Sequence, residues 1–152
     1  TNSAAAAVAR LMDMGCEPYL LASALTGIVA QRLIRLLCPM CQEGFRLDHR
    51  SAVLFNQPEL SGMTMYKPVG CSQCLGLGYM GRTAIQEVMT IGPRLKKVIY
   101  TGARSEEELE ALSIANHMVP IKHDGIDKAI RGLSSLEEVM RVVSEDNERE
   151  GP

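Results

Sequence analysis

The sequence predicts a mixed α/β fold that contains a cysteine-rich segment held together by a metal ion. Residues 28–37 and 82–91 have the composition of strands, and amphipathic helical patterns lie before the first stretch and after the second. Two Cys-x-x-Cys pairs lie between the two stretches. A chain of 152 residues suits one domain or slightly more, because domains cluster at about 100 to 150 residues.

The composition and charge exclude several classes of protein. The chain has 16 basic and 18 acidic residues, so charge alone does not favour nucleic acid or an anionic membrane as a partner. The longest nearly uncharged run, residues 18–31, is shorter than the roughly 20 apolar residues that a membrane-spanning helix needs. No signal-peptide pattern opens the sequence, which begins at Thr1, and we expect the chain to be part of a longer protein.

The N-terminal part, residues 1–37, is predicted to contain two helices followed by a strand. Residues 4–14 carry apolar side chains at helical spacing directly after the cap candidate Ser3. A second helix begins at Pro18, which suits the first position of a helix, and ends near residue 25. The β-branched residues in 28–37 favour a strand over a short helix there.

The segment of residues 38–74 is rich in proline and glycine and poor in large apolar side chains. One short helix near residues 51–56 is expected, and otherwise the segment has the composition of loops. Burial alone does not hold so short a segment folded, because units below about 40 residues normally need metals or disulfides.

Residues 81–143 are predicted to begin with a strand and to continue as helices. The strand of residues 82–91 shows the alternation expected for one buried face. The predicted helices begin at Pro93, Ser105, near Pro120, and at Ser134. Ser134 with Glu137 has the pattern of a capping box. The charged tail, residues 144–152, is expected to be disordered.

The five cysteines carry the strongest chemical signal. An odd number without a secretion signal argues against a disulfide framework and for a reducing compartment. Two residues between cysteines let both thiolates of a turn face one ion, and two such turns complete a closed tetrahedral site. Zinc contributes on the order of 10 kcal/mol to folding in small sites. We therefore expect a structural zinc site with the ligands Cys38, Cys41, Cys71 and Cys74.

Two other interpretations of the cysteine pairs stay open. The four thiols could be reduced and without a ligand, or one pair could be a thioredoxin-like redox centre. A redox pair is expected at a helix start near a strand, whereas both pairs here lie among proline and glycine. The glycine motif of residues 76–81 formally matches a dinucleotide fingerprint, but it enters a predicted strand rather than a helix.

The remaining candidate ligands have simpler interpretations. Cys16 is expected to be a small buried apolar residue, since free cysteines are usually buried. His49 lies between the two cysteine pairs and could replace a missing ligand. His117 and His123 have no partner at ligand spacing and are expected to be solvated or to cap helices.

Three arginines lie on or beside the predicted strands that flank the cysteine segment. Arg32, Arg35 and Arg82 could each reach a phosphate or a neighbouring subunit. The alternative is that their stems cover apolar surface or that one of them pairs with Glu87.

Several segments occur in an order and spacing that are typical of one protein family. These segments are the two cysteine pairs and residues 1–4, 10–15, 17–22, 30–33, 66–70, 78–83 and 135–139. In them the chain resembles the C-terminal part of the type II secretion ATPase family, general secretion pathway protein E. It is also similar to the extension motor of type IV pili. The tetracysteine segment disfavours the pilus retraction motor.

The resemblance implies a division of the chain. Residues 1–37 would end a RecA-like P-loop ATPase domain, residues 38–80 would form an inserted tetracysteine zinc subdomain, and residues 81–143 would add a strand and a small C-terminal helical subdomain. The Walker motifs of the family would precede Thr1. This chain alone would then be inactive, because the lysine and magnesium-binding groups of phosphoryl transfer would be elsewhere.

The resemblance also implies a cofactor, partners and a location. The full-length protein would bind ATP and Mg²⁺ and would work as a homohexamer on the cytoplasmic face of the bacterial inner membrane. It would drive pseudopilus assembly through membrane platform proteins, and no nucleic acid would be involved. The alternatives are a pilus assembly ATPase and, from another class, a zinc-ribbon module that binds nucleic acid.

Overall fold

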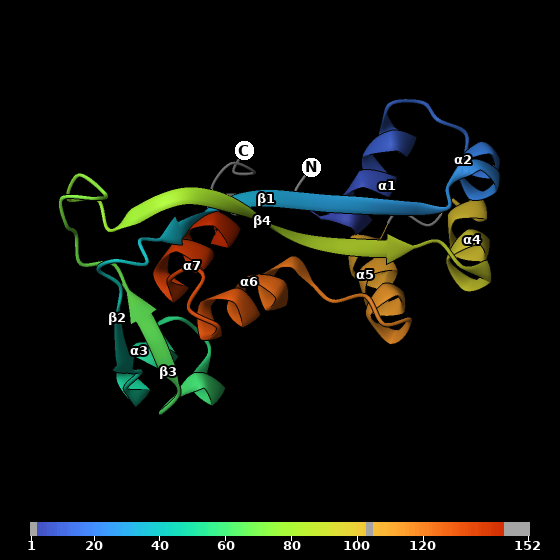
Figure 1. Cartoon of the computed structure of the whole chain (residues 1–152). Coiled ribbons are helices and arrows are strands. Elements are labelled where there is room, and N and C mark those ends of the chain that lie inside the picture. Colours follow the sequence, from blue (N-terminus) through green and yellow to red (C-terminus); the bar gives the residue numbers. More distant parts are fainter. Residues whose placement is uncertain (1–2, 103–104, 145–152) are drawn as a thin grey trace. The chain divides into compact units, whose positions relative to one another are not determined.

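The computed structural model describes residues 3–102 and 105–144, and it has the mixed α/β fold that the sequence predicts (Figure 1). The elements in chain order are α1 (Ala4–Asp13), α2 (Pro18–Ala24), β1 (Gly27–Leu37), β2 (Glu43–Arg46), α3 (His49–Leu54), the 3₁₀ helix η1 (Pro58–Leu60), β3 (Thr64–Lys67), β4 (Tyr79–Thr90), α4 (Pro93–Tyr100), α5 (Glu106–Ala115), α6 (Ile121–Ile130) and α7 (Leu136–Ser144). The predicted tail, apart from residue 144, lies outside the described residues.

The chain divides into two structural units, and strands β1 and β4 contribute to both. The first unit takes the chain up to Gln31 and Gln86–Ile121, and the second takes Arg32–Ile85 and the chain from Lys122 onward. The two strands pair in one two-stranded sheet. In the first unit Ile91 N donates to Thr26 O (3.0 Å), so the end of β4 lies beside the start of β1.

The first unit is held together by apolar side chains from its helices and strands. Helix α1 packs on α5, and α2 packs on α4. The buried core comprises Ala4, Ala5, Val8, Met12, Leu21, Ala22, Met89, Ile91, Leu95, Ile99, Leu109 and Met118. These residues follow the helical and alternating patterns of the sequence, which explains why the predicted helices and both long strands are confirmed here.

A buried carboxylate in the first unit binds the first backbone amides of two helices. Glu87, on β4, is 4% exposed and accepts hydrogen bonds from Ala4 N (2.7 Å) and Ile121 N (3.0 Å). These amides begin α1 and α6, and a negative charge at a helix start is favoured by the helix dipole. Glu87 is therefore a cap for two helices rather than the arginine partner considered from the sequence.

The second unit contains the end of β1, the start of β4, and helices α6 and α7. Ile34 and Ile85 are fully buried on the two strands, and Val139 is fully buried on α7. Helices α6 and α7 approach closely at Gly125, where a Cβ atom would lie 2.5 Å from Val139 Cγ1. A glycine is needed at this position because the space is already occupied.

The cysteine-rich segment has more regular structure than the sequence predicts. The short helix is confirmed as α3, which begins slightly earlier than expected. Strands β2 and β3 were not predicted, and they pair antiparallel with Phe45 opposite Met65. Each has only four residues, which is too short for a pattern to identify. Their pairing depends on contacts between parts of the chain that are distant in sequence.

The start of α7 also differs from the prediction. The helix is capped by Ser135, whose Oγ accepts a hydrogen bond from Glu138 N (3.1 Å). The predicted cap, Ser134, instead donates its hydroxyl to Arg35 O (2.7 Å). The capping box of Ser134 with Glu137 is therefore wrong by one residue, because a contact with β1 engages the first serine.

Candidate metal centre

The two cysteine pairs lie in two tight turns at the ends of the long strands. Cys38 follows β1, and a hydrogen bond from Gln42 N to Cys38 O (3.0 Å) closes the turn that contains Cys41. The second turn precedes β4 and is closed by a hydrogen bond from Gly76 N to Cys71 O (2.9 Å). The two-residue spacing thus produces the turns that the sequence predicts.

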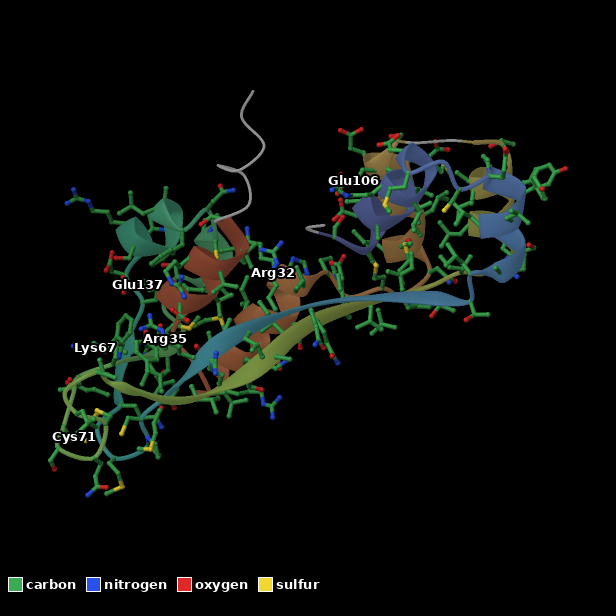
Figure 2. The ribbon with its side chains drawn as sticks, turned by 90° about the horizontal axis from the view of Figure 1, so that it is seen from above. Arg32, Arg35, Lys67, Cys71, Glu106 and Glu137 are labelled. Atoms are coloured by element: carbon green, nitrogen blue, oxygen red, sulfur yellow. The ribbon has the colours of Figure 1, made fainter. Side chains whose placement is uncertain are left out.

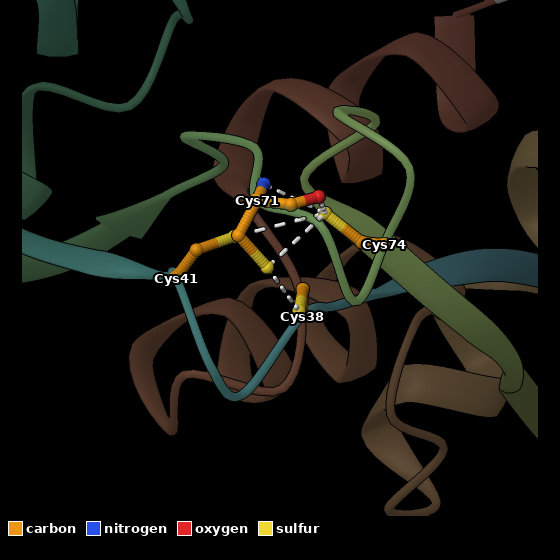
Figure 3. A group of neighbouring side chains, drawn as sticks. All are labelled: Cys38, Cys41, Cys71 and Cys74. Carbon is orange, nitrogen blue, oxygen red and sulfur yellow. Dashed lines mark hydrogen bonds between the residues drawn. The ribbon is translucent and has the colours of Figure 1, made fainter.

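The four sulfur atoms converge into one cluster, as Figure 3 shows. All four Sγ atoms lie within 4.8 Å of one another. The sulfur–sulfur distances are 3.9 Å for Cys38 and Cys71, 3.9 Å for Cys41 and Cys74, and 3.8 Å for Cys71 and Cys74. Four sulfurs arranged tetrahedrally about an ion at about 2.3 Å would be about 3.8 Å apart. The cluster therefore fits a metal ion bound by four thiolates.

Backbone amides point at two of the four sulfurs. Cys74 Sγ accepts hydrogen bonds from Cys71 N (3.2 Å) and Gly78 N (3.1 Å), and Cys41 Sγ accepts one from Gly70 N (3.3 Å). Because an N–H donor stabilises a thiolate more than a thiol, these contacts favour the form that binds metals.

The two sulfurs that receive amide donors differ in pKa. Burial raises the pKa of the Cys74 thiol, but the amide donors of Cys71 and Gly78 outweigh burial and lower it to about 6. Burial raises the pKa of the Cys41 thiol to about 11, although Gly70 N opposes the change. Without a cation the cluster therefore does not ionise fully near neutral pH, whereas a bound metal ion deprotonates its thiols.

Glycines give the second turn its shape. Gly70 has a φ of +106°, and a Cβ atom there would lie 2.7 Å from Gly76 O. Gly76, Gly78 and Gly81 also have positive φ, as expected for the glycine motif. The motif leaves a cysteine turn and enters β4, so it lacks the strand-to-helix context of a dinucleotide-binding loop.

The prediction for Cys16 is wrong, because this residue is exposed rather than buried. Helix α1 ends at Asp13 with Met14 as its cap; the next residue, Gly15, has a φ of +92°, and Cys16 N donates to Leu11 O (3.0 Å). This is the hydrogen bond of a Schellman-type helix end, which turns the chain away from the helix. The local turn thus overrides the apolar character of the thiol.

The histidines lie outside the cysteine cluster. His49 is exposed at the first position of α3, and it is not among the residues whose ligand atoms converge. His117 and His123 are both exposed, as expected for solvated side chains.

The arginines of β1 contact the last helix. Arg35 donates two side-chain hydrogen bonds to the Glu138 carboxylate, from Nε (3.1 Å) and Nη2 (2.7 Å). Arg32 Nη1 donates to Val142 O (2.7 Å). Figure 2 shows both arginines on the same strand, with Cys71 in the loop that precedes β4. Arg82 is exposed on β4.

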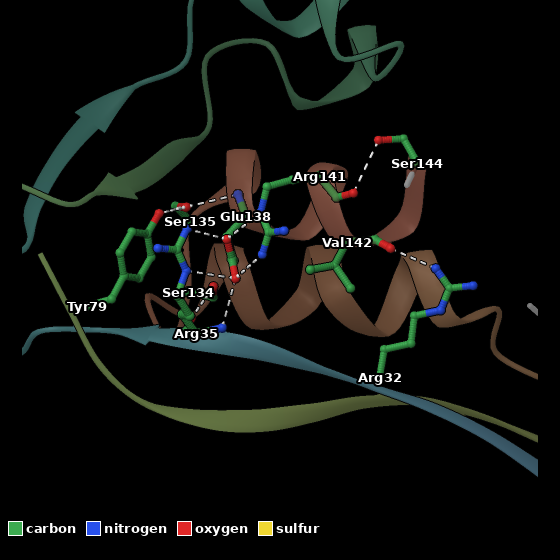
Figure 4. A network of polar contacts seen from close by, with 9 residues as sticks. All are labelled: Arg32, Arg35, Tyr79, Ser134, Ser135, Glu138, Arg141, Val142 and Ser144. Atoms are coloured by element: carbon green, nitrogen blue, oxygen red, sulfur yellow. Dashed lines mark hydrogen bonds and ion pairs between the residues drawn. The ribbon is translucent and has the colours of Figure 1, made fainter. Parts of the chain in front are cut away.

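Glu138 is the centre of a polar network that sequence reasoning missed (Figure 4). Its side chain is 1% exposed and also accepts from Arg141 Nε (3.1 Å) and Nη2 (2.9 Å). Burial opposes ionisation of Glu138, but hydrogen bonds from Arg35 and Arg141 lower its pKa to about 2. Sequence spacing offers no signal for this burial, because Glu138 lies outside the helical stripe formed by Leu136, Val139, Met140 and Val143.

The fold and the cluster together define a mixed α/β chain with a tetracysteine site. Comparison with known proteins identifies the family of this chain. The family model "Type II/IV secretion system protein" matches residues 1–141. The chain therefore belongs to the type II/IV secretion system protein family, which confirms the resemblance found in the sequence.

The relatives include both secretion and pilus proteins. The chain is 42% identical over 95% of its length to type II secretion system ATPase E of Vibrio cholerae, and 45% identical over 99% to a putative type II secretion system protein E of Escherichia coli. It is 35% identical over 92% of its length to the type IV pilus assembly ATPase PilB of Thermus thermophilus. The matches cover 28%, 30% and 16% of these relatives.

None of the helices in the described part of the chain has the length and apolar character needed to cross a membrane.

Proposed function

We propose that the cysteine cluster binds one structural zinc ion through Cys38, Cys41, Cys71 and Cys74. The observation that carries this proposal is the convergence of four sulfur atoms within 4.8 Å. Four thiolates suit zinc and leave no coordination position for a substrate or water. The ion would cross-link the end of β1 to the start of β4 and close the segment between them.

We further propose that the chain is the C-terminal part of a motor ATPase that powers type II protein secretion by assembling a pseudopilus. The support is the family match and the identity to two proteins named as type II secretion components. In this proposal, residues 1–37 end a RecA-like P-loop domain, residues 38–80 form the zinc subdomain, and residues 81–143 add a strand and a helical subdomain.

The full-length protein would bind ATP and Mg²⁺ and act as a homohexamer. It would lie on the cytoplasmic face of the inner membrane and meet that membrane through platform proteins of the secretion system. Residues 1–152 contain no Walker A sequence, so they would not hydrolyse ATP by themselves. Their contribution would be structural, since the zinc site is closed.

A type IV pilus assembly ATPase is the second candidate, favoured by the relative from Thermus thermophilus. Complementation separates the two. The full-length gene should restore export in a strain that lacks its secretion ATPase and should not restore pili in a strain that lacks the pilus extension ATPase. The reverse result would assign the chain to pilus assembly.

The zinc proposal is tested by elemental analysis of the purified chain. We expect about one zinc per chain, as one four-thiolate site requires. Cobalt substitution should give the absorption spectrum of a tetrahedral thiolate site. A folded chain that contains no metal after purification in zinc-supplemented, chelator-free buffer would overturn the proposal. Salt-sensitive binding to DNA would support the nucleic-acid module instead.

The ATPase proposal is tested with the full-length protein. Phosphate release should depend on Mg²⁺, and the isolated chain of residues 1–152 should release none above background. Magnesium-dependent turnover by the isolated chain would contradict the assignment of the catalytic groups to the rest of the protein.

A further inference from the structure

We propose that occupancy of the cysteine cluster controls how firmly helix α7 docks on the strands, and that Tyr79 connects the two sites. This inference rests on the proposed metal site. It adds control of the docking of α7 to a site that would otherwise only cross-link the two cysteine turns. All residues involved belong to the second structural unit.

The connection begins at Gly78, which is held by one cysteine from each pair. Gly78 N donates to Cys74 Sγ (3.1 Å), and Gly78 O accepts from Cys38 N (3.0 Å). Gly78 has a φ of +74°, and a Cβ atom there would lie 2.4 Å from Pro68 Cβ. The backbone at this point is therefore positioned directly by the two cysteine turns.

The next residue, Tyr79, contacts the start of α7. Its hydroxyl lies 2.7 Å from Ser135 Oγ, the atom that caps this helix. The guanidinium of Arg35 lies over the Tyr79 ring, 4.1 Å from the ring centroid. Figure 4 shows Tyr79, Ser135 and Arg35 around the Glu138 carboxylate. A shift of Tyr79 would thus disturb both the helix cap and the arginine that neutralises a buried charge.

The other cysteine turn reaches the same place through β1. Leu37, the residue before Cys38, donates its N–H to Leu133 O (2.9 Å), and Arg35 O accepts from Ser134 Oγ (2.7 Å). The two paths therefore converge on residues 133–138, at the beginning of α7.

The cysteine-bounded segment also contacts this region directly. The Tyr66 ring of β3 fills the space beside Gly132, where a Cβ atom would lie 3.2 Å from the ring. Helix α7 also packs against β3. Loss of the metal ion would loosen the turns and β3 together, and α7 would lose support at its start and along its side.

Hydrogen–deuterium exchange on the purified 152-residue chain tests the inference. Zinc-loaded protein is compared with protein stripped by a chelator under reducing conditions. We expect faster exchange after stripping in residues 38–44 and 68–80 and also in residues 133–144. Peptides from α4 and α5, in the first unit, should exchange at unchanged rates.

The variant Tyr79→Phe tests the contact between Tyr79 and α7 without changing a metal ligand. This variant should keep one zinc per chain but lose the hydroxyl contact with Ser135. Exchange at the start of α7 in the zinc-loaded variant should rise about fivefold, the factor expected for one neutral hydrogen bond. Tyr100→Phe, at an exposed tyrosine of α4, is the matched control and should change nothing.

The outcomes distinguish this inference from the metal proposal. If zinc binds but residues 133–144 exchange at the same rate in loaded and stripped protein, the inference is wrong and the metal site stands. If no metal binds, the metal proposal fails first, and the inference fails with it. If stripping unfolds the whole chain, the test is the exchange rate of α7 in the zinc-loaded Tyr79→Phe variant. An unchanged rate there overturns the inference.

Discussion

Two regions of this chain are stabilised in different ways. The helices α1, α2, α4 and α5 bury a shared apolar core with the adjoining ends of the strands. The segment between the cysteine pairs buries few large side chains, mainly Leu47, Leu60 and Met65, and brings four thiols together instead. Burial and metal ligation are thus alternative means of fixing a backbone, and each region should be destabilised by its own perturbation: loss of core volume in the first and loss of a ligand in the second.

The largest expected effect is the loss of one cysteine from the cluster. Cys74→Ser removes the sulfur that receives two amide hydrogen bonds, and we expect it to abolish stoichiometric metal binding. Thermal unfolding should then show an early transition, with increased proteolysis within residues 38–80. Cys16→Ser is the matched control, because this cysteine is exposed and lies outside the cluster. Equal metal loss in both variants would contradict the site.

Shortening a buried side chain of the helical core should destabilise the first unit and leave the metal bound. Ile99 is fully buried on α4, and Ile99→Ala should destabilise the chain by about 3 kcal/mol because it leaves a cavity. Urea unfolding measures the loss, and elemental analysis should still find the same zinc content. Zinc loss in this folded variant would show that the two regions do not fail separately.

Acid should weaken the second unit through Glu138. Its pKa falls from 4.5 to about 2 on folding, so its stabilising contribution is complete above pH 4.5 and is lost as the pH falls toward 2. The free energy of unfolding of the wild type, relative to Glu138→Gln, should therefore decrease by about 3 kcal/mol across this range. The variant shares any acid-induced metal loss, so the difference isolates the carboxylate.

Glu137→Gln is the control for the acid experiment, since Glu137 is exposed on the same helix. Its stability should follow the wild type at every pH. A wild type and a Glu138→Gln variant with parallel pH profiles would show that Arg35 and Arg141 do not lower the pKa of this group.

The smallest expected effect concerns the cap of α7. Ser135→Ala removes the side chain that accepts from Glu138 N and should cost about 1 kcal/mol of unfolding free energy. Ser144→Ala, at the exposed end of the same helix, should cost less than about 0.5 kcal/mol. Urea titration measures the free energy of unfolding of both variants. Equal values would show that Ser135 does not cap the helix.

Periodicity and turn chemistry predicted most of the regular structure. Helices α1, α2 and α4 to α7 and strands β1 and β4 lie where their patterns predict them, to within a few residues. The two-residue spacing of the cysteines predicted both turns, because that spacing constrains the backbone locally. The ligand assignment itself stays a prediction.

Local patterns did not predict contacts between distant parts of the chain. The strands β2 and β3 are too short to identify alone. The neighbouring serines before α7 offer the same chemistry, and only the approach of Arg35 O decides that Ser135 is the cap. The partner of Arg35 is Glu138, which is 103 residues away in sequence.

The α/β class, the long helices and strands, and the two cysteine turns could be predicted from the order of the residues. These features depend on residue spacing within a turn, a helix or a strand, which the order of residues already specifies. The capping of two helices by Glu87 and the contact of the Tyr79 hydroxyl with Ser135 at the start of α7 came from the folded chain instead. Hydrogen bonds and burial between distant segments depend on which segments meet in space, and the residues of one segment do not contain that information.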